Sequence, residues 1–288
     1  MKFAESGLPN NKLVEDAFNY SHANVMSYRD EVMKDFTQQI NQSHAAQLRQ
    51  LDADKVAGTL SPDDYKKEKE ALDKMRDEQM KMGPRIVDRE LDNNFNQRRL
   101  GPAQELVNNG EKASPELLAA VILNECVRSP LDYLKLAKKF GDKVADVIAQ
   151  MQHIDVYPGE RDANLAAANS DVKRAYMAQL ITNLGDIMSQ VKLMAKVSPG
   201  QKVMFADGQE EALFGNAKSV WGNDKKLDQR FVAVFNSAAE ATTSPFRMEV
   251  DEKNNLELIK SNLNPPTGPK VTPPKGPGDK HGLGDDVF

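Results

Sequence analysis

Three serine–proline pairs mark helix starts in this chain, and they constrain its fold more than any other sequence feature. They are Ser61-Pro62, Ser114-Pro115 and Ser129-Pro130, each followed closely by an acidic residue. A serine side chain caps the free N–H groups of a helix start, proline fits the first helical position, and an acid there interacts favourably with the helix dipole. No series of alternating strands appears, and aromatic residues make up only 6% of the chain. We therefore predict an all-α fold, a helical bundle preceded by long N-terminal helices.

Residues 1–97 form the first predicted region, which has the pattern of long, polar helices. Gly58 interrupts the helical pattern, Ser61 restarts it, and Gly83-Pro84 is expected to end it, so this part predicts a helix–turn–helix hairpin. Apolar residues before the hairpin recur at three- and four-residue spacing and give one apolar stripe, which we expect to pack on the rest of the chain or to mediate self-association. The stripe consists of Val14, Phe18, Val25, Met26, Val32, Met33, Phe36 and Ile40.

The hairpin segment LRQLDADKVAGTLSPDDYKKEKEALDKM resembles the short bacterial helical module called SHOCT. The shared features are the Leu48-x-x-Leu51 pair, the turn at Gly58, the capped restart, and then Tyr65 and Leu72. The resemblance covers about 28 residues, a length that fits one antiparallel pair of helices. It implies a small helical hairpin and names no chemistry.

Residues 98–263 form the second predicted region, where the helices become shorter and more apolar. Expected helices include one from Asp171 to Val197, with a polar loop before it at residues 157–159 and a short extended piece at Phe246–Val250. The third region, residues 264–288, is rich in proline and glycine and cannot bury a core. We expect a solvated, disordered tail with polyproline II character there, and the alternative is a docking segment for a partner with an aromatic groove.

Charge and cysteine content exclude several classes of function. The formal net charge of −5 gives no reason to expect sequence-independent binding of nucleic acid. The single cysteine, Cys126, excludes an internal disulfide and a thiolate-cluster zinc site, and its apolar surroundings predict a buried side chain. No phosphate-binding loop, nucleophile elbow or paired-histidine motif is present, and no apolar run is long enough to cross a membrane. We expect a cytoplasmic protein with no membrane contact.

Four successive segments resemble the HD-type metal-dependent phosphohydrolase domain, in the branch found in RelA/SpoT-like alarmone hydrolases. They are Gly101-Pro102, LLAAVILNECVRSP, AKKFGDKVADVIAQMQHID and ITNLGDIM, and together they cover about 90 residues. The resemblance implies a helical HD fold. In that family two histidines and two aspartates hold a divalent ion, commonly manganese, which activates a water molecule for attack on a phosphoryl group.

This sequence departs from the family at nearly every position that carries the chemistry. The first ligand histidine is replaced by Gly101, the His-Asp pair by Asn124-Glu125, and the acidic pair that positions water by Arg128-Ser129; only Asp186 matches a ligand by type. We therefore expect a remnant pocket without a metal or other cofactor. If a metal binds, the ligands would be Asn124, Glu125 and Asp186, a set that suits magnesium or calcium better than manganese. Arg128 is expected to pair with Glu125 or Asp186, and the alternative is that it binds phosphate.

Two functions from different classes follow from the resemblance. The first is a catalytically inactive HD-like domain, a pseudo-hydrolase that serves as a regulatory or scaffold module binding a protein partner or a ligand, or self-associating through its N-terminal helices. The second is a metal-dependent hydrolase of a phosphorylated or pyrophosphorylated nucleotide, with a rebuilt site that uses no histidine. If the resemblance is coincidental, an all-α interaction protein remains. The family interpretation requires Gly101, Asn124, Glu125 and Asp186 to converge in one pocket.

Overall fold

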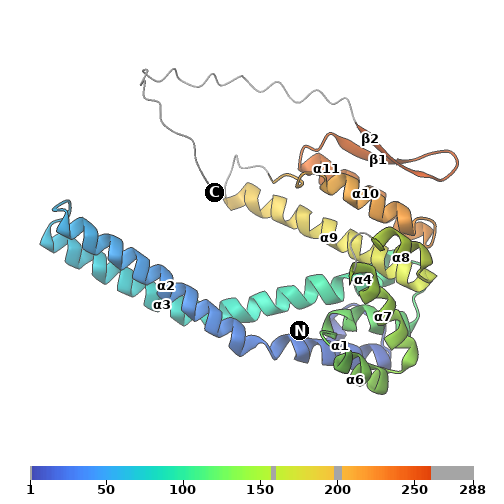
Figure 1. The fold of residues 1–288 in the computed structure, drawn as a ribbon, viewed down its shortest axis with the longest axis horizontal. Coiled ribbons are helices and arrows are strands. Elements are labelled where there is room, and N and C mark those ends of the chain that lie inside the picture. The colour runs from blue at the N-terminus through green and yellow to red at the C-terminus, as the bar shows by residue number, and fades with distance from the viewer. Residues whose placement is uncertain (1, 157–159, 198–202, 261–288) are drawn as a thin grey trace.

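The computed structural model describes residues 2–156, 160–197 and 203–260, and its described part is mostly helical (Figure 1). Two strands, β1 and β2, form one antiparallel hairpin in which Met248 pairs with Leu258. The predicted all-α class is thus confirmed. The elements in chain order are η1 (Phe3–Glu5), α1 (Lys12–Met26), α2 (Arg29–Val56), α3 (Pro62–Asn94), η2 (Phe95–Leu100), α4 (Gly101–Asn109), α5 (Pro115–Leu123), η3 (Asn124–Cys126), α6 (Pro130–Phe140), α7 (Asp142–Val156), α8 (Arg161–Ala167), α9 (Ser170–Val197), α10 (Gln209–Val220), α11 (Lys225–Ala241), β1 (Phe246–Val250) and β2 (Leu256–Lys260).

The three serine–proline pairs start helices as predicted. The side-chain oxygen of Ser61 accepts a hydrogen bond from the Asp64 N–H at 3.1 Å, and Ser114 accepts one from Leu117 at the same distance. Ser129 accepts from the Asp132 N–H at 3.3 Å. The extended piece expected at Phe246–Val250 is β1. The loop expected at 157–159 and the tail expected at 264–288 lie outside the described residues.

Helices α2 and α3 form an antiparallel hairpin that projects from the rest of the molecule as an arm (Figure 1). Gly58, with a φ of +73°, makes the turn between them, in agreement with the sequence. The expected helix end at Gly83-Pro84 is wrong, because α3 continues through both residues to Asn94. A side chain at Gly83 would lie 2.8 Å from the Phe36 ring, so this glycine serves close packing of the two helices and does not end one. A proline inside a helix kinks it, and α3 bends between the arm and the body.

The body is built around α5, whose apolar residues Leu117 to Leu123 are all buried. Helix α1 packs directly on α5, and the Ser21 hydroxyl donates a hydrogen bond to the Ile122 carbonyl at 2.9 Å. The N-terminal stripe divides between two clusters: Val14 joins the main core, and Phe18 joins a smaller one beside Phe95 of η2. The expected boundary between residues 97 and 98 falls inside η2, and α1 lies in the body although the sequence grouped it with the arm.

A buried ion pair fixes α11 against α9 and the α4–α5 loop. Asp224, only 2% exposed, accepts hydrogen bonds from Arg174 Nε at 3.1 Å and from the Glu111 N–H at 2.7 Å, and its other oxygen caps the start of α11. One turn later, Asp228 is 4% exposed and accepts a hydrogen bond from the Gly222 N–H at 2.9 Å. Burial raises the pKa of Asp228 to about 6, and the neighbouring Asp224 charge adds to the rise.

Among the described residues, no helix is both long and apolar enough to cross a lipid bilayer.

The raised pKa of Asp228 predicts that stability falls as the pH rises. The folded protein holds the proton more tightly than the unfolded chain, so the cost of the buried charge is absent below pH 4 and complete above pH 6. We expect Asp228→Asn, which keeps an acceptor for Gly222, to stabilise the protein at pH 7.5 by an amount on the order of 2 to 3 kcal/mol. Urea unfolding at pH 4, 5, 6 and 7.5 measures this.

The matched control is Asp251→Asn, because hydrogen bonds from Asn255 lower the pKa of that carboxyl group. This control should lose stability at pH 7.5 and not gain it. Equal pH dependence of unfolding for the native protein and Asp228→Asn would contradict the assignment.

Candidate functional site

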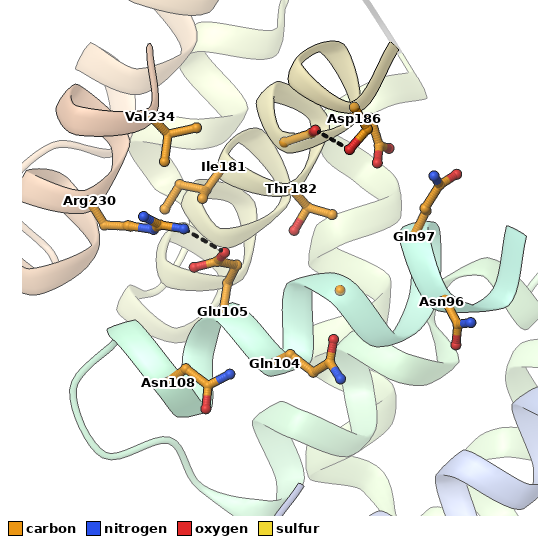
Figure 2. A pocket seen from close by; sticks show the side chains of 13 residues that line it. Asn96, Gln97, Gln104, Glu105, Asn108, Ile181, Thr182, Asp186, Arg230 and Val234 are labelled. Atoms are coloured by element: carbon orange, nitrogen blue, oxygen red, sulfur yellow. Dashed lines mark hydrogen bonds and ion pairs between the residues drawn. The ribbon is translucent and has the colours of Figure 1, made fainter. Parts of the chain in front are cut away.

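A cavity of about 360 Å³ opens where η2, α4, α9 and α11 meet (Figure 2). Polar side chains dominate its wall, and no histidine is among its described lining residues. Arg230 and Glu105 meet on one side of it, and Asp186 and Gln97 lie on the other (Figure 2). The residues that line it are Asn96, Gln97, Gly101, Gln104, Glu105, Asn108, Ile181, Thr182, Gly185, Asp186, Ser189, Arg230 and Val234.

Gly101 allows α4 to approach α9 at the floor of this cavity. A Cβ atom at this position would lie 2.7 Å from Thr182 Cγ2 and 3.2 Å from the Asn96 carbonyl oxygen. Such distances are shorter than ordinary van der Waals contact, so a larger residue would force the helices apart. Glycine at this position therefore serves the close packing of α4 on α9.

Two carboxylates and one guanidinium are the charged groups that line the cavity. Glu105 pairs with Arg230 at 3.6 Å, so the positive charge of Arg230 is already balanced. Asp186 is half-buried; burial raises the pKa of its carboxyl group, and the charge of Arg98 opposes the rise. The side-chain oxygen of Asn96 is buried without a hydrogen-bond partner in the described structure. This arrangement suits a small molecule that donates hydrogen bonds, neutral or cationic, better than a phosphate.

The structure divides the six residues of the expected remnant pocket. Gly101 and Asp186 line the same cavity, as the resemblance to the HD domain implies. The other four do not line it: Asn124 and Glu125 lie in η3, and Arg128 and Ser129 lie in the turn that leads to α6. The described cavity therefore contains one of the three expected metal ligands.

Each of those four residues has a structural contact in the fold. Gln152 of α7 donates hydrogen bonds to the backbone and side-chain oxygens of Asn124 at 2.9 and 3.1 Å. The Glu125 carbonyl accepts a hydrogen bond from Arg99, and Ser129 caps α6. The Arg128 guanidinium lies 4.2 Å from the centre of the Tyr28 ring.

The expected ion pair of Arg128 with Glu125 or Asp186 is wrong, because no such pair occurs among the described residues. Arg128 is exposed on the surface, where the Tyr28 ring between α1 and α2 supplies an aromatic face. A surface position removes the need for a carboxylate partner that a buried guanidinium would have.

A buried arginine that the sequence did not indicate, Arg99, joins the three elements η2, α1 and η3. Arg99 of η2 is 4% exposed, and its Nη1 donates to the Ser21 carbonyl at 3.2 Å and to Asn24 Oδ1 and Cys126 Sγ at 3.1 Å. Cys126 is buried as predicted, and burial raises the pKa of its thiol although the Arg99 charge opposes the rise. The neighbouring Arg98 is exposed, so residue type alone could not reveal which arginine turns inward.

No protein-family model matches this chain, and no curated protein matches it either. Within residues 2–156, 160–197 and 203–260, no group of three or more His, Cys, Asp or Glu side chains is placed to hold a metal ion. The HD-type and SHOCT-like resemblances, and the metal set of Asn124, Glu125 and Asp186, therefore stay predictions.

The close approach at Gly101 predicts that even a methyl group there is costly. We expect Gly101→Ala to destabilise the protein by about 1 to 3 kcal/mol, because the new Cβ meets Thr182 Cγ2. Thr182→Ser removes that methyl group and keeps the hydroxyl that donates to the Ala178 carbonyl, so the double variant should recover at least half of the loss. Urea unfolding of the four proteins measures the coupling.

Gly185→Ala is the matched control, because Gly185 lines the same cavity and nothing lies within 4 Å of a Cβ atom built there. It should be neutral or slightly stabilising, since alanine favours a helix more than glycine does. If Gly101→Ala is tolerated as well as Gly185→Ala, the packing explanation is wrong.

Proposed function

We propose that this chain is a non-catalytic, HD-like binding module in which the helical body is a scaffold and the α2–α3 arm contacts other protein chains. One observation carries the proposal: four of the six residues that the resemblance matches to a phosphohydrolase's ligands and catalytic acids have structural roles in the fold. Asn124 binds Gln152, Arg128 stacks on Tyr28, and Ser129 caps α6. Gly101 makes room for Thr182.

The exposure of the arm supports a role in contacting proteins. Of the 28 residues of α2, only Leu51 is buried. Apolar side chains on the arm remain exposed, including Val56 at 88% and Met82 at 57%. A helix of this length spans about 42 Å and gains little stability from its own chain beyond its seam with α3. Such an arm offers a large surface to a partner without removing apolar residues from the core of the body.

The two carboxylates in the cavity support a role in ligand binding rather than in phosphoryl transfer. A phosphate group entering it would meet the carboxylates of Glu105 and Asp186, and Arg230 is already paired with Glu105. An anionic transition state needs preorganised donors or cations at that place. The free, buried thiol of Cys126 suits a reducing compartment, and we infer a cytoplasmic module from it.

A metal and turnover assay tests the proposal. The full chain is incubated with Mn²⁺ or Mg²⁺ and then with pyrophosphorylated guanosine and adenosine nucleotides; released phosphate or pyrophosphate is measured, and bound metal is determined by mass spectrometry. We expect substoichiometric metal and no release above the protein-free control, because the imidazole ligands are missing.

The contradicting result is stoichiometric metal together with turnover, both lost in Asp186→Ala and both retained in Asp251→Ala. Asp251 is the matched control because it is a carboxylate far along the chain, in the turn between β1 and β2, and does not line the cavity. That outcome would establish the enzyme with a rebuilt site.

A further inference from the structure

The middle of α2 lacks charge, although the helix lies in a solvated arm. From Phe36 to Leu48 there is no Asp, Glu, Lys or Arg, and Asp35 and Arg49 bracket this stretch. The helix that pairs with it is very different, since α3 carries Lys66, Lys67, Glu68, Lys69 and Glu70 in succession. Exposed helix faces are normally charged. An uncharged stretch of this length presents no like charges that would repel a second copy of the same helix.

The side chains that make up this surface lie on the face of α2 turned away from α3. The face toward α3 is identified by His44, whose Nε2 lies 2.9 Å from Asp73 Oδ1, and by Phe36, which packs on Gly83. At 100° per residue, the opposite face carries positions at alternating three- and four-residue spacing. We call this set the α2 stripe: Asp35, Gln38, Gln42, Ala45 and Arg49.

The α2 stripe is open to solvent and lies along a groove. Asp35, Gln38, Gln42 and Arg49 are exposed, and Ala45 is half-buried. The last four residues of the stripe line a groove together with Lys34, Thr37 and Asn41. Neither Asp35 nor Arg49 has an ion-pair partner among the described residues of the chain. The two end charges of the stripe are therefore available to a partner.

The centre and the two ends of the α2 stripe are complementary to those of a second copy. When two copies of α2 run antiparallel about a two-fold axis at Gln42, Asp35 of each copy faces Arg49 of the other, seven positions from the axis on either side. Gln42 faces Gln42, and an amide is both a donor and an acceptor, so identical amides can bond to each other. Under the same axis Ala45 faces Gln39 and Gln38 faces Ala46, so no charged residue lies between the two ends, and the small alanines let the helices approach.

We propose that the arm binds a second copy of this chain, with α2 packed antiparallel on α2 through the α2 stripe. The inference rests on the proposed role of the arm as a protein-contact surface and names its partner. A partner other than a second copy would not require an acid and a base at equal distances from a central amide. It would not require an uncharged segment between them either. The polar seam predicts reversible association that depends on concentration.

Reversing the charges of Asp35 and Arg49, the two ends of the stripe, is the first test. The mass of the full chain is followed by light scattering from about 1 µM to about 1 mM, the range of moderate to weak binding. It should rise from 32.0 kDa toward twice that value. Asp35→Arg and Arg49→Asp each place like charges together twice in the dimer and should weaken it by about tenfold. The double variant should recover native association, and Glu70→Arg on exposed α3 should leave it unchanged.

Cysteine cross-linking is the second test, and it fixes the register. Gln42→Cys places two thiols at the axis, so mild oxidation should give a covalent dimer. Asp35→Cys places them about 21 Å apart along the helices and should give none. The native Cys126 is buried and does not interfere.

A chain that is monomeric throughout the concentration range, or a dimer that both single charge variants leave intact, overturns the inference. The same holds if Asp35→Cys cross-links as readily as Gln42→Cys. These outcomes are distinct from failure of the proposed function, which appears as turnover lost in Asp186→Ala.

Discussion

The buried guanidinium of Arg99 holds three elements of the body together. It lies where η2, α1 and η3 meet, and its donors reach Ser21, Asn24, Cys126 and the Glu125 carbonyl. Within the described part of the chain no carboxylate pairs with it, and its Nε has no partner. A buried charge without a counter-ion is costly unless dipoles surround it closely. The three elements must therefore keep their positions, which leaves η3 little freedom to serve as a catalytic segment.

The sequence predicted those parts of the fold that short-range chemistry determines. Ser61, Ser114 and Ser129 cap helices, Gly58 turns the arm, and Cys126 is buried, because each depends on neighbours along the chain. What it missed depends on tertiary contacts. Gly83-Pro84 continues a helix because Phe36 packs there, and α1 joins the body because its stripe meets α5. The inward turn of Arg99 follows from the π-helical η2, which no pattern of residue types marked.

The sequence predicted only part of the candidate site. Gly101 and Asp186 share a cavity because α4 and α9 pack side by side, and only the resemblance to the HD domain pointed to their proximity. The other expected residues have different contacts: Asn124 with Gln152, Glu125 with Arg99, and Arg128 with Tyr28. These partners are distant along the chain, so the sequence could not reveal them, whereas Ser129 caps its own helix. Most of the buried apolar residues lie in the body, whereas α2 of the arm buries only Leu51.

Hydrogen exchange followed by mass spectrometry, on the native chain and on Arg99→Lys, tests whether Arg99 holds α1 and η3 in place. In the native chain, α1 and α5 should be protected together, and the outer part of the α2–α3 arm should exchange faster. An ammonium group cannot reach all the acceptors of a guanidinium, so Arg99→Lys should reduce protection in α1 and η3 together and leave α10 and α11 unchanged. Arg99 does not hold these elements together if α1 exchanges hydrogen as fast as the outer part of the arm, or if Arg99→Lys leaves α1 and η3 as protected as before.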